Sequence, residues 1–156
     1  MNVEWRDFLK QTGADWNDDL AMRFGQSNAE SSATLKSNVC CDLSHLGLIV
    51  VHGPDTERFL QGQLTCDVRQ VTMQYIRTGA HCNPKGRVLA CFRLFRREDA
   101  YYLELPKVMV NATLGRLRKY LLRAKAVLED ASDALARFGV AGPNAADLVG
   151  SVLGTV

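Results

Sequence analysis

The hydrophobic pattern in the middle of the chain predicts an antiparallel sheet. An apolar run at 46–51 is rich in β-branched residues and predicts a buried strand. Residues 87–96 alternate between an apolar and a mixed face, as a strand with one buried side does. Segments 75–82 and 101–105 predict further strands, joined to 87–96 by short turns. We therefore expect these last three strands to form a meander.

Two helices are predicted beside this sheet. Pro54 and Pro106 each suit the first turn of a helix, where the missing N–H costs nothing. After Pro106, apolar residues recur at helical spacing from Val110 to Ala124. The outer face of this second helix is predicted to hold Arg116, Arg118, Lys119, Arg123 and Lys125. Gly62 in the first helix costs about 1 kcal/mol relative to alanine, which indicates either tight packing against a strand or a ligand near the backbone.

The ends of the chain carry weaker signals. Apolar residues at helix-like spacing predict a helical region over 3–25, and the polar, Ser/Asn-rich segment 26–38 predicts a surface loop. Near the other end, two short strands at 126–129 and 136–141 precede a helix at 143–153. The strand at 136–141 and the helix at 143–153 follow a polar break at 130–133, so we expect them to begin a second domain that is truncated at its end. The fold class is therefore α+β, an antiparallel sheet flanked by helices with an incomplete second α/β domain.

Composition supports a globular, intracellular protein. The chain is 47% hydrophobic and 23% charged, which is typical of folded domains. No apolar run approaches the roughly 20 residues that span a bilayer, and residues 1–10 carry acids where a signal peptide needs an apolar core. The 5 cysteines are odd in number and lack C-x-x-C spacing. We therefore expect free thiols, no structural zinc, no membrane association and a cytoplasmic location.

The net charge of +2 is unevenly distributed along the chain. Residues 1–45 and 126–156 each carry −3, whereas residues 46–125 carry +8. A positive central region favours an anionic partner, either a polyanion or a small carboxylate or phosphate ligand. The alternative is that these arginines only keep a sheet face soluble.

Most catalytic signatures are absent. The sequence contains no nucleophile elbow, Walker loop or dinucleotide fingerprint, and its three histidines lack metal-ligand spacing. The paired carboxylates lie in surface-like segments. Polar residues around the turn at 83–87 remain as candidates: Lys85 holds an anion or is simply solvated. Cys91 and Arg93 lie on the mixed face of their strand, where Cys91 is either a reactive or an inert thiol.

Three stretches in order resemble one family: FLQGQLTCDV at 59–68, NPKGR at 83–87 and KYLLRAK at 119–125. DLSH at 42–45 also resembles the motif that opens the T-protein fold. Together they resemble the folate-binding YgfZ family, bacterial relatives of a mitochondrial iron–sulfur assembly factor within the glycine-cleavage T-protein superfamily. The resemblance covers residues 42–153, which indicates the N-terminal portion of such a protein. The family's Lys-Gly-Cys-Tyr-x-Gly-Gln-Glu segment would lie further along than Val156.

The resemblance implies a multi-domain protein around a tetrahydrofolate cavity. It divides the chain into a helical extension and loop at 1–41, a first-domain portion at 42–133 and the start of a truncated ferredoxin-like domain at 134–156. Such proteins support iron–sulfur enzymes, including one that thiomethylates tRNA, so folate and iron–sulfur client enzymes are the expected partners. Direct binding of nucleic acid is not expected. Binding of RNA through 116–125 is the competing hypothesis and requires salt-dependent affinity.

The resemblance also assigns candidate cofactor-binding residues. T-proteins carry an Asp pair, one of them catalytic, at the positions of Ala90 and Cys91. This departure argues against an aminomethyltransferase-like enzyme, which stays the alternative, and no catalytic residue or metal site is expected. Tyr102 matches a cavity tyrosine, while Cys91 and Arg93 are expected to face the cavity. Further positions match the family pattern without an assigned role: Gln61, Gln63, Asp67, Asn83, Lys85 and Arg87.

Overall fold

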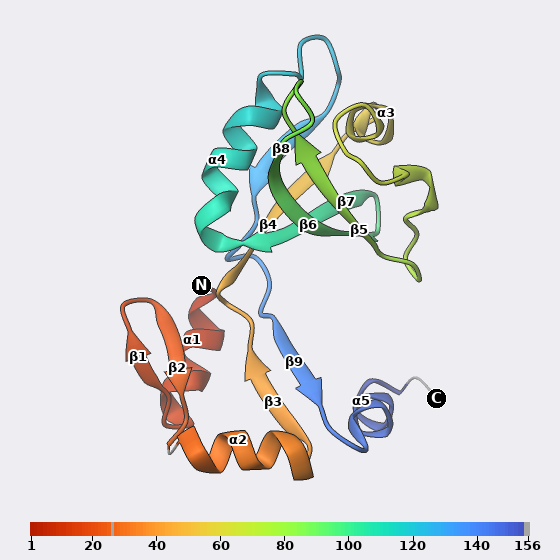
Figure 1. Cartoon of the computed structure of the whole chain (residues 1–156). Helices are drawn as coiled ribbons and strands as arrows, with labels where there is room; N and C mark the ends of the chain where they lie inside the picture. The colour runs from red at the N-terminus through yellow and green to blue at the C-terminus, as the bar shows by residue number, and fades with distance from the viewer. Residues whose placement is uncertain (26, 155–156) are drawn as a thin grey trace. The chain divides into compact units, whose positions relative to one another are not determined.

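The computed structural model describes residues 1–25 and 27–154 (Figure 1). The chain divides into two compact units. Residues 46–133 form one, here called the sheet unit, and residues 1–45 with 134–156 form the other, the terminal unit. Each is described by itself below.

A five-stranded antiparallel sheet is the centre of the sheet unit, with strand order β5-β6-β7-β4-β8. The strands are β4 (Leu46–His52), β5 (Arg77–Cys82), β6 (Val88–Arg97), β7 (Ala100–Pro106) and β8 (Val127–Asp130). The predicted meander is confirmed as β5-β6-β7. The turn between β6 and β7 is tight enough to place Glu98 at a φ of 54°.

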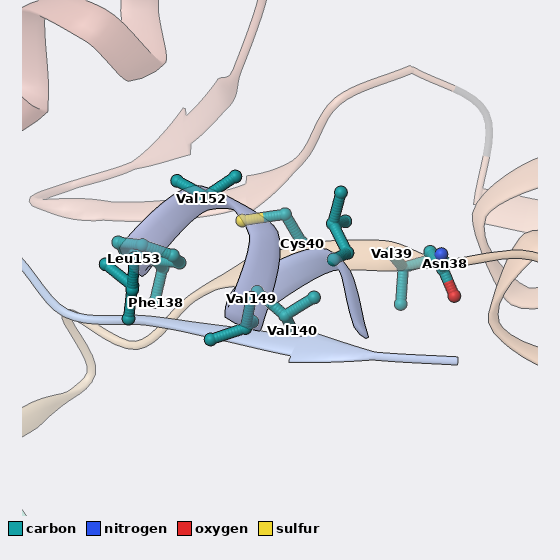
Figure 2. A pocket seen from close by; sticks show the side chains of 9 residues that line it. Asn38, Val39, Cys40, Phe138, Val140, Val149, Val152 and Leu153 are labelled. Atoms are coloured by element: carbon teal, nitrogen blue, oxygen red, sulfur yellow. The ribbon is translucent and has the colours of Figure 1, made fainter. Parts of the chain in front are cut away.

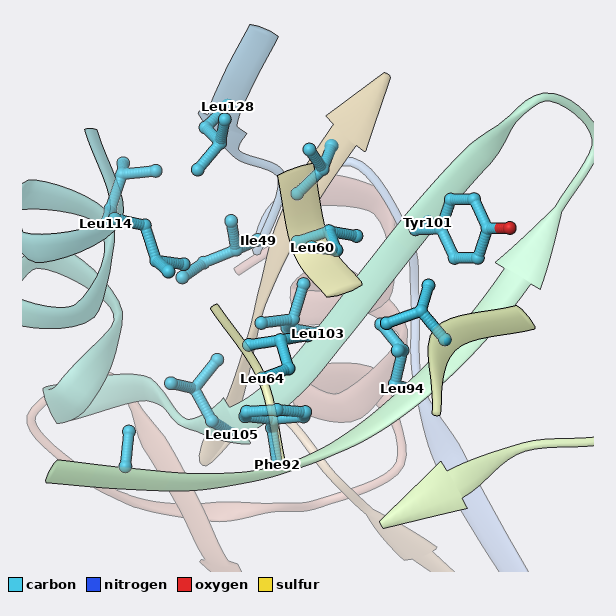
Figure 3. Close-up of a cluster of buried hydrophobic side chains, with 14 of the residues drawn as sticks. Ile49, Leu60, Leu64, Phe92, Leu94, Tyr101, Leu103, Leu105, Leu114 and Leu128 are labelled. Carbon is cyan, nitrogen blue, oxygen red and sulfur yellow. The ribbon is translucent and has the colours of Figure 1, made fainter. Parts of the chain in front are cut away.

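One face of this sheet carries the hydrophobic core (Figure 3). Helix α3 (Thr56–Gln61), the 3-10 turn η1 (Val68–Gln70) and helix α4 (Lys107–Arg118) contribute side chains to it. The predicted alternation of β6 is confirmed, since Ala90, Phe92 and Leu94 are buried while Cys91 and Arg93 are exposed. Burial of one side of each strand therefore fixes which residues remain on the opposite, open face.

Glycine is required where α4 approaches β4. A Cβ at Gly47 would lie 2.4 Å from Val110 Cγ2 and 3.2 Å from the backbone Cα of Lys107. Gly62 is different, because a Cβ there would meet only Phe59 O at 3.6 Å and Arg58 O at 3.8 Å. Tight packing against a strand is therefore the wrong explanation for Gly62.

Replacing Gly62 with alanine is expected to stabilise the chain. The residue has right-handed helical geometry, φ −82° and ψ −11°, so alanine fits without strain and reduces the freedom of the unfolded chain. We expect a gain of about 0.4–1 kcal/mol in the free energy of unfolding. Urea denaturation measures it. Gly47→Ala is the matched control and should destabilise, because its new methyl group overlaps Val110.

The terminal unit contains helices and two small sheets. Its elements are α1 (Val3–Gln11), β1 (Asp15–Asn17), β2 (Leu20–Arg23), α2 (Ser27–Lys36), β3 (Val39–Asp42), β9 (Phe138–Ala141) and α5 (Ala145–Leu153). Strand β1 pairs with β2, and β3 pairs antiparallel with β9. The predicted strand and helix near the end of the chain are confirmed as β9 and α5.

Two predictions for the first 38 residues are wrong. The helical region holds only for α1, since β1 and β2 form a hairpin whose turn places Asp18 at a φ of 52°. The predicted loop is helix α2 over 27–36, while residue 26 lies outside the described residues. Helix α2 lacks an apolar stripe, because it consists almost entirely of polar and small residues. Hydrophobic periodicity therefore could not reveal it.

Pairing of β3 with β9 brings together segments that the sequence assigned to different domains. Trp5 supports the same unit, because its Nε1 donates to Asp42 Oδ1 at 2.7 Å and its ring stacks on Phe138. The start of the chain and residues 134–156 are thus grouped in one compact unit, and the predicted domain division stays a prediction. The assignment of ferredoxin-like character to 134–156 stays a prediction. None of the helices that the structure describes is long and apolar enough to cross a membrane.

Candidate functional site

The side of β6 and β7 that turns away from the core gathers several predicted site residues. Strand β6 contributes Cys91, Arg93 and Phe95, and β7 contributes Tyr102 and Glu104. The register places Arg93 opposite Glu104 and Phe95 opposite Tyr102. These five residues are here called the open face. The structure therefore brings Cys91, Arg93 and Tyr102 onto one surface.

An ion pair anchors the centre of the open face. Arg93 Nε donates to Glu104 Oε2 at 2.7 Å, and Nη2 pairs with the same oxygen. The Glu104 side chain is 9% exposed, whereas that of Arg93 is 51% exposed. The carboxylate is thus buried and compensated, while part of the guanidinium remains available to an anion in solution. Glu104 was missed by sequence reasoning, although an acid within the apolar run YYLEL was a usable signal.

A cavity of about 250 Å³ lies beside this ion pair. Cys91, Arg93 and Glu104 line part of its wall. Its remaining lining residues are Leu46, Thr78, Phe92, Leu105 and Pro106. Along the same face, the Tyr102 ring stacks on Phe95, with centroids 5.2 Å apart and planes 8° apart. The surface thus combines an apolar recess, an aromatic pair and one half-exposed cation.

The other predicted site residues do not lie on the open face. The side chains of Asn83 and Gln61 accept hydrogen bonds from the backbone. Asn83 Oδ1 accepts from the backbone N–H groups of Lys85 and Arg87, each at 3.0 Å, which closes the β5–β6 turn. Gln61 Oε1 accepts from Val68 N–H at 2.8 Å. Gln61 belongs to α3 on the core side of the sheet. Lys85 and Arg87 are exposed on the hairpin, and a role for these four residues in cofactor binding stays a prediction.

The basic stretch at 116–125 does not form one helical face. Helix α4 ends at Arg118, so Lys119, Arg123 and Lys125 lie in the following non-helical segment. Arg118 Nη2 donates to the carbonyl of Leu128 at 2.7 Å and thereby binds helix to strand. The predicted continuous basic helix is therefore wrong, because α4 ends at Arg118 and Leu122 has a φ of 42°.

Each of the five cysteines is a free thiol. Burial raises the pKa of Cys66, whose sulfur packs against Gly79. Burial, followed by the neighbouring Cys41, also raises the pKa of Cys40. Within residues 1–25 and 27–154, no group of His, Cys, Asp and Glu side chains could hold a metal ion.

We expect Cys66 and Cys91, two of the three cysteines of the sheet unit, to differ in alkylation rate. Cys91 is exposed on β6, whereas Cys66 is half-buried with a raised pKa. Because only the thiolate reacts, iodoacetamide at pH 8 should modify Cys91 before Cys66. Peptide mass spectrometry over time measures both rates. If Cys91 and Cys66 reacted at equal rates in the folded chain as well as in urea, the difference in burial described here would be contradicted.

The terminal unit holds a different kind of cavity (Figure 2). It has a volume of about 370 Å³ and lies against β3, β9 and α5. Its lining residues are Asn38, Val39, Cys40, Phe138, Val140, Leu148, Val149, Val152 and Leu153. Among the described residues that line it, none carries a charged side chain.

Comparison with known proteins identifies the family. Residues 4–156 match the model of the GCVT N-terminal domain. The tRNA-modifying protein YgfZ of Colwellia psychrerythraea is 34% identical over 119 residues, which is 76% of this chain and 36% of that protein. The tRNA-modifying protein YgfZ of Photorhabdus laumondii is 36% identical over 127 residues, 81% of this chain and 38% of that protein. The chain thus spans less than half the length of these relatives.

A solved structure gives the same answer for the fold. Glycine cleavage system aminomethyltransferase T from Bartonella henselae superposes with a TM-score of 0.77 at 20% identity, over 97% of this chain and 43% of that one. The α+β fold of the T-protein is therefore confirmed. The family match covers almost the whole chain, and the resemblance to YgfZ proteins is confirmed by curated relatives. The chain belongs to the glycine-cleavage T-protein family defined by the GCVT N-terminal domain, with YgfZ proteins among its relatives.

Proposed function

We propose that this chain forms part of a cytoplasmic, tetrahydrofolate-binding accessory protein that supports iron–sulfur cluster assembly or repair and tRNA modification. The observation that carries the proposal is the convergence of Cys91, Arg93 and Tyr102 on the open face. Relatives that are named tRNA-modifying proteins support the tRNA part of the proposal. Iron–sulfur client enzymes are the partners expected from the resemblance.

The chemistry of the open face fits a folate. Folates combine a flat ring system, an aromatic linker and an anionic glutamate tail. The recess lined by Leu46, Leu105 and Pro106 offers apolar contact to a ring, and the stacked pair of Tyr102 and Phe95 offers an aromatic surface. The half-exposed guanidinium of Arg93 offers charge-assisted hydrogen bonds to a carboxylate.

Aminomethyl transfer is less well supported. Of the two positions that match the T-protein Asp pair, Ala90 is buried on the core face and only Cys91 reaches the open face. The carboxylate that does lie there, Glu104, is engaged by Arg93. We therefore propose folate binding without transfer. Release of formaldehyde or ammonia from an aminomethyl donor, dependent on folate, would instead support the transferase alternative.

Isothermal titration of tetrahydrofolate into the 156-residue chain tests the binding proposal. Cys91→Trp places an indole in the recess and is expected to weaken binding about tenfold or more. Val88→Trp is the matched control, because Val88 is exposed on the same strand but points to the opposite side from Cys91. It should bind like the unmodified chain.

Two results would count against this site. Equal affinity of the Cys91→Trp and Val88→Trp variants would place the folate elsewhere. Absence of saturable binding by any variant would show that the open face does not bind folate by itself. The tRNA part is tested separately, by mass spectrometry of thiomethylated nucleosides in cells that lack the gene and in cells complemented with the Cys91→Trp variant.

A further inference from the structure

A second groove lies between α3 and the segment that follows α4. It has a volume of about 360 Å³. Its lining residues are Asp55, Arg58, Phe59, Gly62 and Gln63 on one side and Leu121, Leu122, Arg123 and Ala124 on the other. This groove, here called the α3 groove, shares no lining residue with the recess beside Arg93. Two of the sequence stretches singled out above, 59–68 and 119–125, therefore meet at a place that the proposed folate site does not use.

Hydrogen bonds hold the two sides of the groove together. Asp55 Oδ2 accepts from the backbone N–H of Lys125 at 2.7 Å, and the N–H of Asp55 donates to the Lys125 carbonyl at 3.3 Å. The backbone at Gly53 also lies close to this segment, because a Cβ at Gly53 would be 2.5 Å from the Lys125 carbonyl oxygen. The segment after α4 is thus fixed against the start of α3, which makes the groove a formed surface.

The floor of the groove is open at Gly62. The absent side chain there is explained neither by positive φ nor by packing, because its nearest neighbours would be 3.6 and 3.8 Å away. Gly62 is exposed and lines the groove. Any side chain at this position would occupy groove volume, so glycine keeps the space and the backbone accessible to something that binds.

Leu122 is the most unusual residue at the rim. It has a φ of 42°, in a region that costs energy for a residue with a Cβ, and its side chain is 90% exposed. Such strain persists where the surrounding structure imposes it, and it is concentrated at functional positions. The strained turn therefore presents a large aliphatic side chain to solvent beside Leu121 and Ala124.

Positive charge borders this apolar rim. Arg58 and Arg123 line the groove, and neither forms an ion pair with any residue that the structure describes. The segment 119–125 also contains Lys119 and Lys125 and no acid. The carboxylate on the lining, that of Asp55, already accepts the Lys125 N–H. Guanidinium groups bind carboxylates with two parallel hydrogen bonds, so the electrostatics favour an acidic ligand.

We propose that the α3 groove docks a peptide segment of a partner protein, one that presents a carboxylate beside a large aliphatic side chain. The carboxylate pairs with Arg58 or Arg123, and the aliphatic side chain packs on Leu121 and Leu122. A peptide fits better than single-stranded nucleic acid, because the exposed rim is aliphatic whereas nucleic-acid sites stack bases on aromatic rings. This docking site is independent of folate binding.

Selection from a phage-displayed library of random dodecapeptides tests the proposal. The immobilised 156-residue chain is the target, and the Gly62→Trp variant, which fills the groove, is used for counter-selection. We expect enriched sequences to share an acid next to Leu, Ile or Met. Absence of enrichment over the counter-selected variant, or enrichment of basic sequences, would overturn the proposal.

Fluorescence anisotropy with an enriched peptide then locates the contact. Arg58→Glu and Arg123→Glu are each expected to weaken binding about tenfold, and Leu122→Ser by a similar factor. Arg97→Glu is the matched control, since Arg97 is exposed at the end of β6 and does not line this groove. It should leave the affinity unchanged. Circular dichroism confirms that each variant is folded.

Two further outcomes would contradict the proposal. Equal weakening by Arg97→Glu would indicate attraction to overall charge rather than to the α3 groove. Displacement of the peptide by a twelve-nucleotide single-stranded RNA, with the RNA itself losing affinity in Arg123→Glu, would make the groove a nucleic-acid site. The Cys91→Trp variant should still bind the peptide. Loss of folate binding can therefore be distinguished from loss of peptide docking.

Discussion

Leu103→Ala is expected to lower the free energy of unfolding by about 2–5 kcal/mol, the range for Leu-to-Ala changes in well-packed cores. Leu103 is 0% exposed and lies on β7 between Leu94 of β6 and Ile49 of β4 (Figure 3). Strands on both sides prevent the backbone from collapsing into the space that the side chain leaves. Because whole domains are stable by only about 5–15 kcal/mol, this one change removes a large share of the margin. Urea denaturation followed by far-UV circular dichroism measures it.

Val108→Ala is the control for that experiment. Val108 is 88% exposed on α4, so its removal deletes apolar atoms without opening a cavity, and the change should stay within about 0.5 kcal/mol. A similar cost for the two substitutions would mean that Leu103 does not lie in a close-packed core. The sheet as described would then be wrong.

The sequence predicted the sheet unit better than the terminal unit, for a physical reason. In β6 the alternation of Ala90, Phe92 and Leu94 with Cys91 and Arg93 records burial of one face, and burial imposes that pattern directly. The turn at Asn83 carries its own chemistry, because the Asn side chain caps the N–H groups that follow it. Local sequence and tertiary structure agree in this part of the chain.

In the terminal unit the determining interactions are distant or weakly patterned. Strand β3 was not predicted, because it is only 4 residues long and its partner β9 lies far away in the sequence. The β1–β2 hairpin turns at Asp18 without a glycine at the left-handed position, so the usual turn signature is missing. The polar helix α2 likewise has no apolar stripe to detect.

The candidate site was partly visible for a related reason. Cys91 and Arg93 could be placed on one face from β6 alone, because side chains alternate along a strand. Glu104 required the register between β6 and β7, which places it opposite Arg93. Sequence reasoning had no access to that register, so it could not recognise that the cation of the site already has a buried partner. The structure adds the partner and the recess beside it.

This ion pair leads to a second large effect: Arg93→Leu is expected to destabilise the chain by about 1–3 kcal/mol. The reason is the environment of the carboxylate that remains. Glu104 is 9% exposed and would lose both guanidinium contacts, so a buried charge would be left without compensation. This expected destabilisation is low for a buried ion pair, because the Arg93 side chain is 51% exposed and water screens part of the attraction.

The reverse substitution should be far milder, and that asymmetry is the diagnostic result. In Glu104→Leu, the half-exposed guanidinium of Arg93 can turn to solvent, so we expect a cost below about 1 kcal/mol. The double variant Arg93→Leu with Glu104→Leu should be more stable than Arg93→Leu alone, because no buried charge remains. Urea denaturation at pH 7 of the four proteins gives the coupling free energy of the pair. Equal costs for the two single variants would mean that Glu104 is hydrated in the folded protein; in that case Arg93 would not be held by a buried partner, and its orientation toward the recess would lose its structural basis.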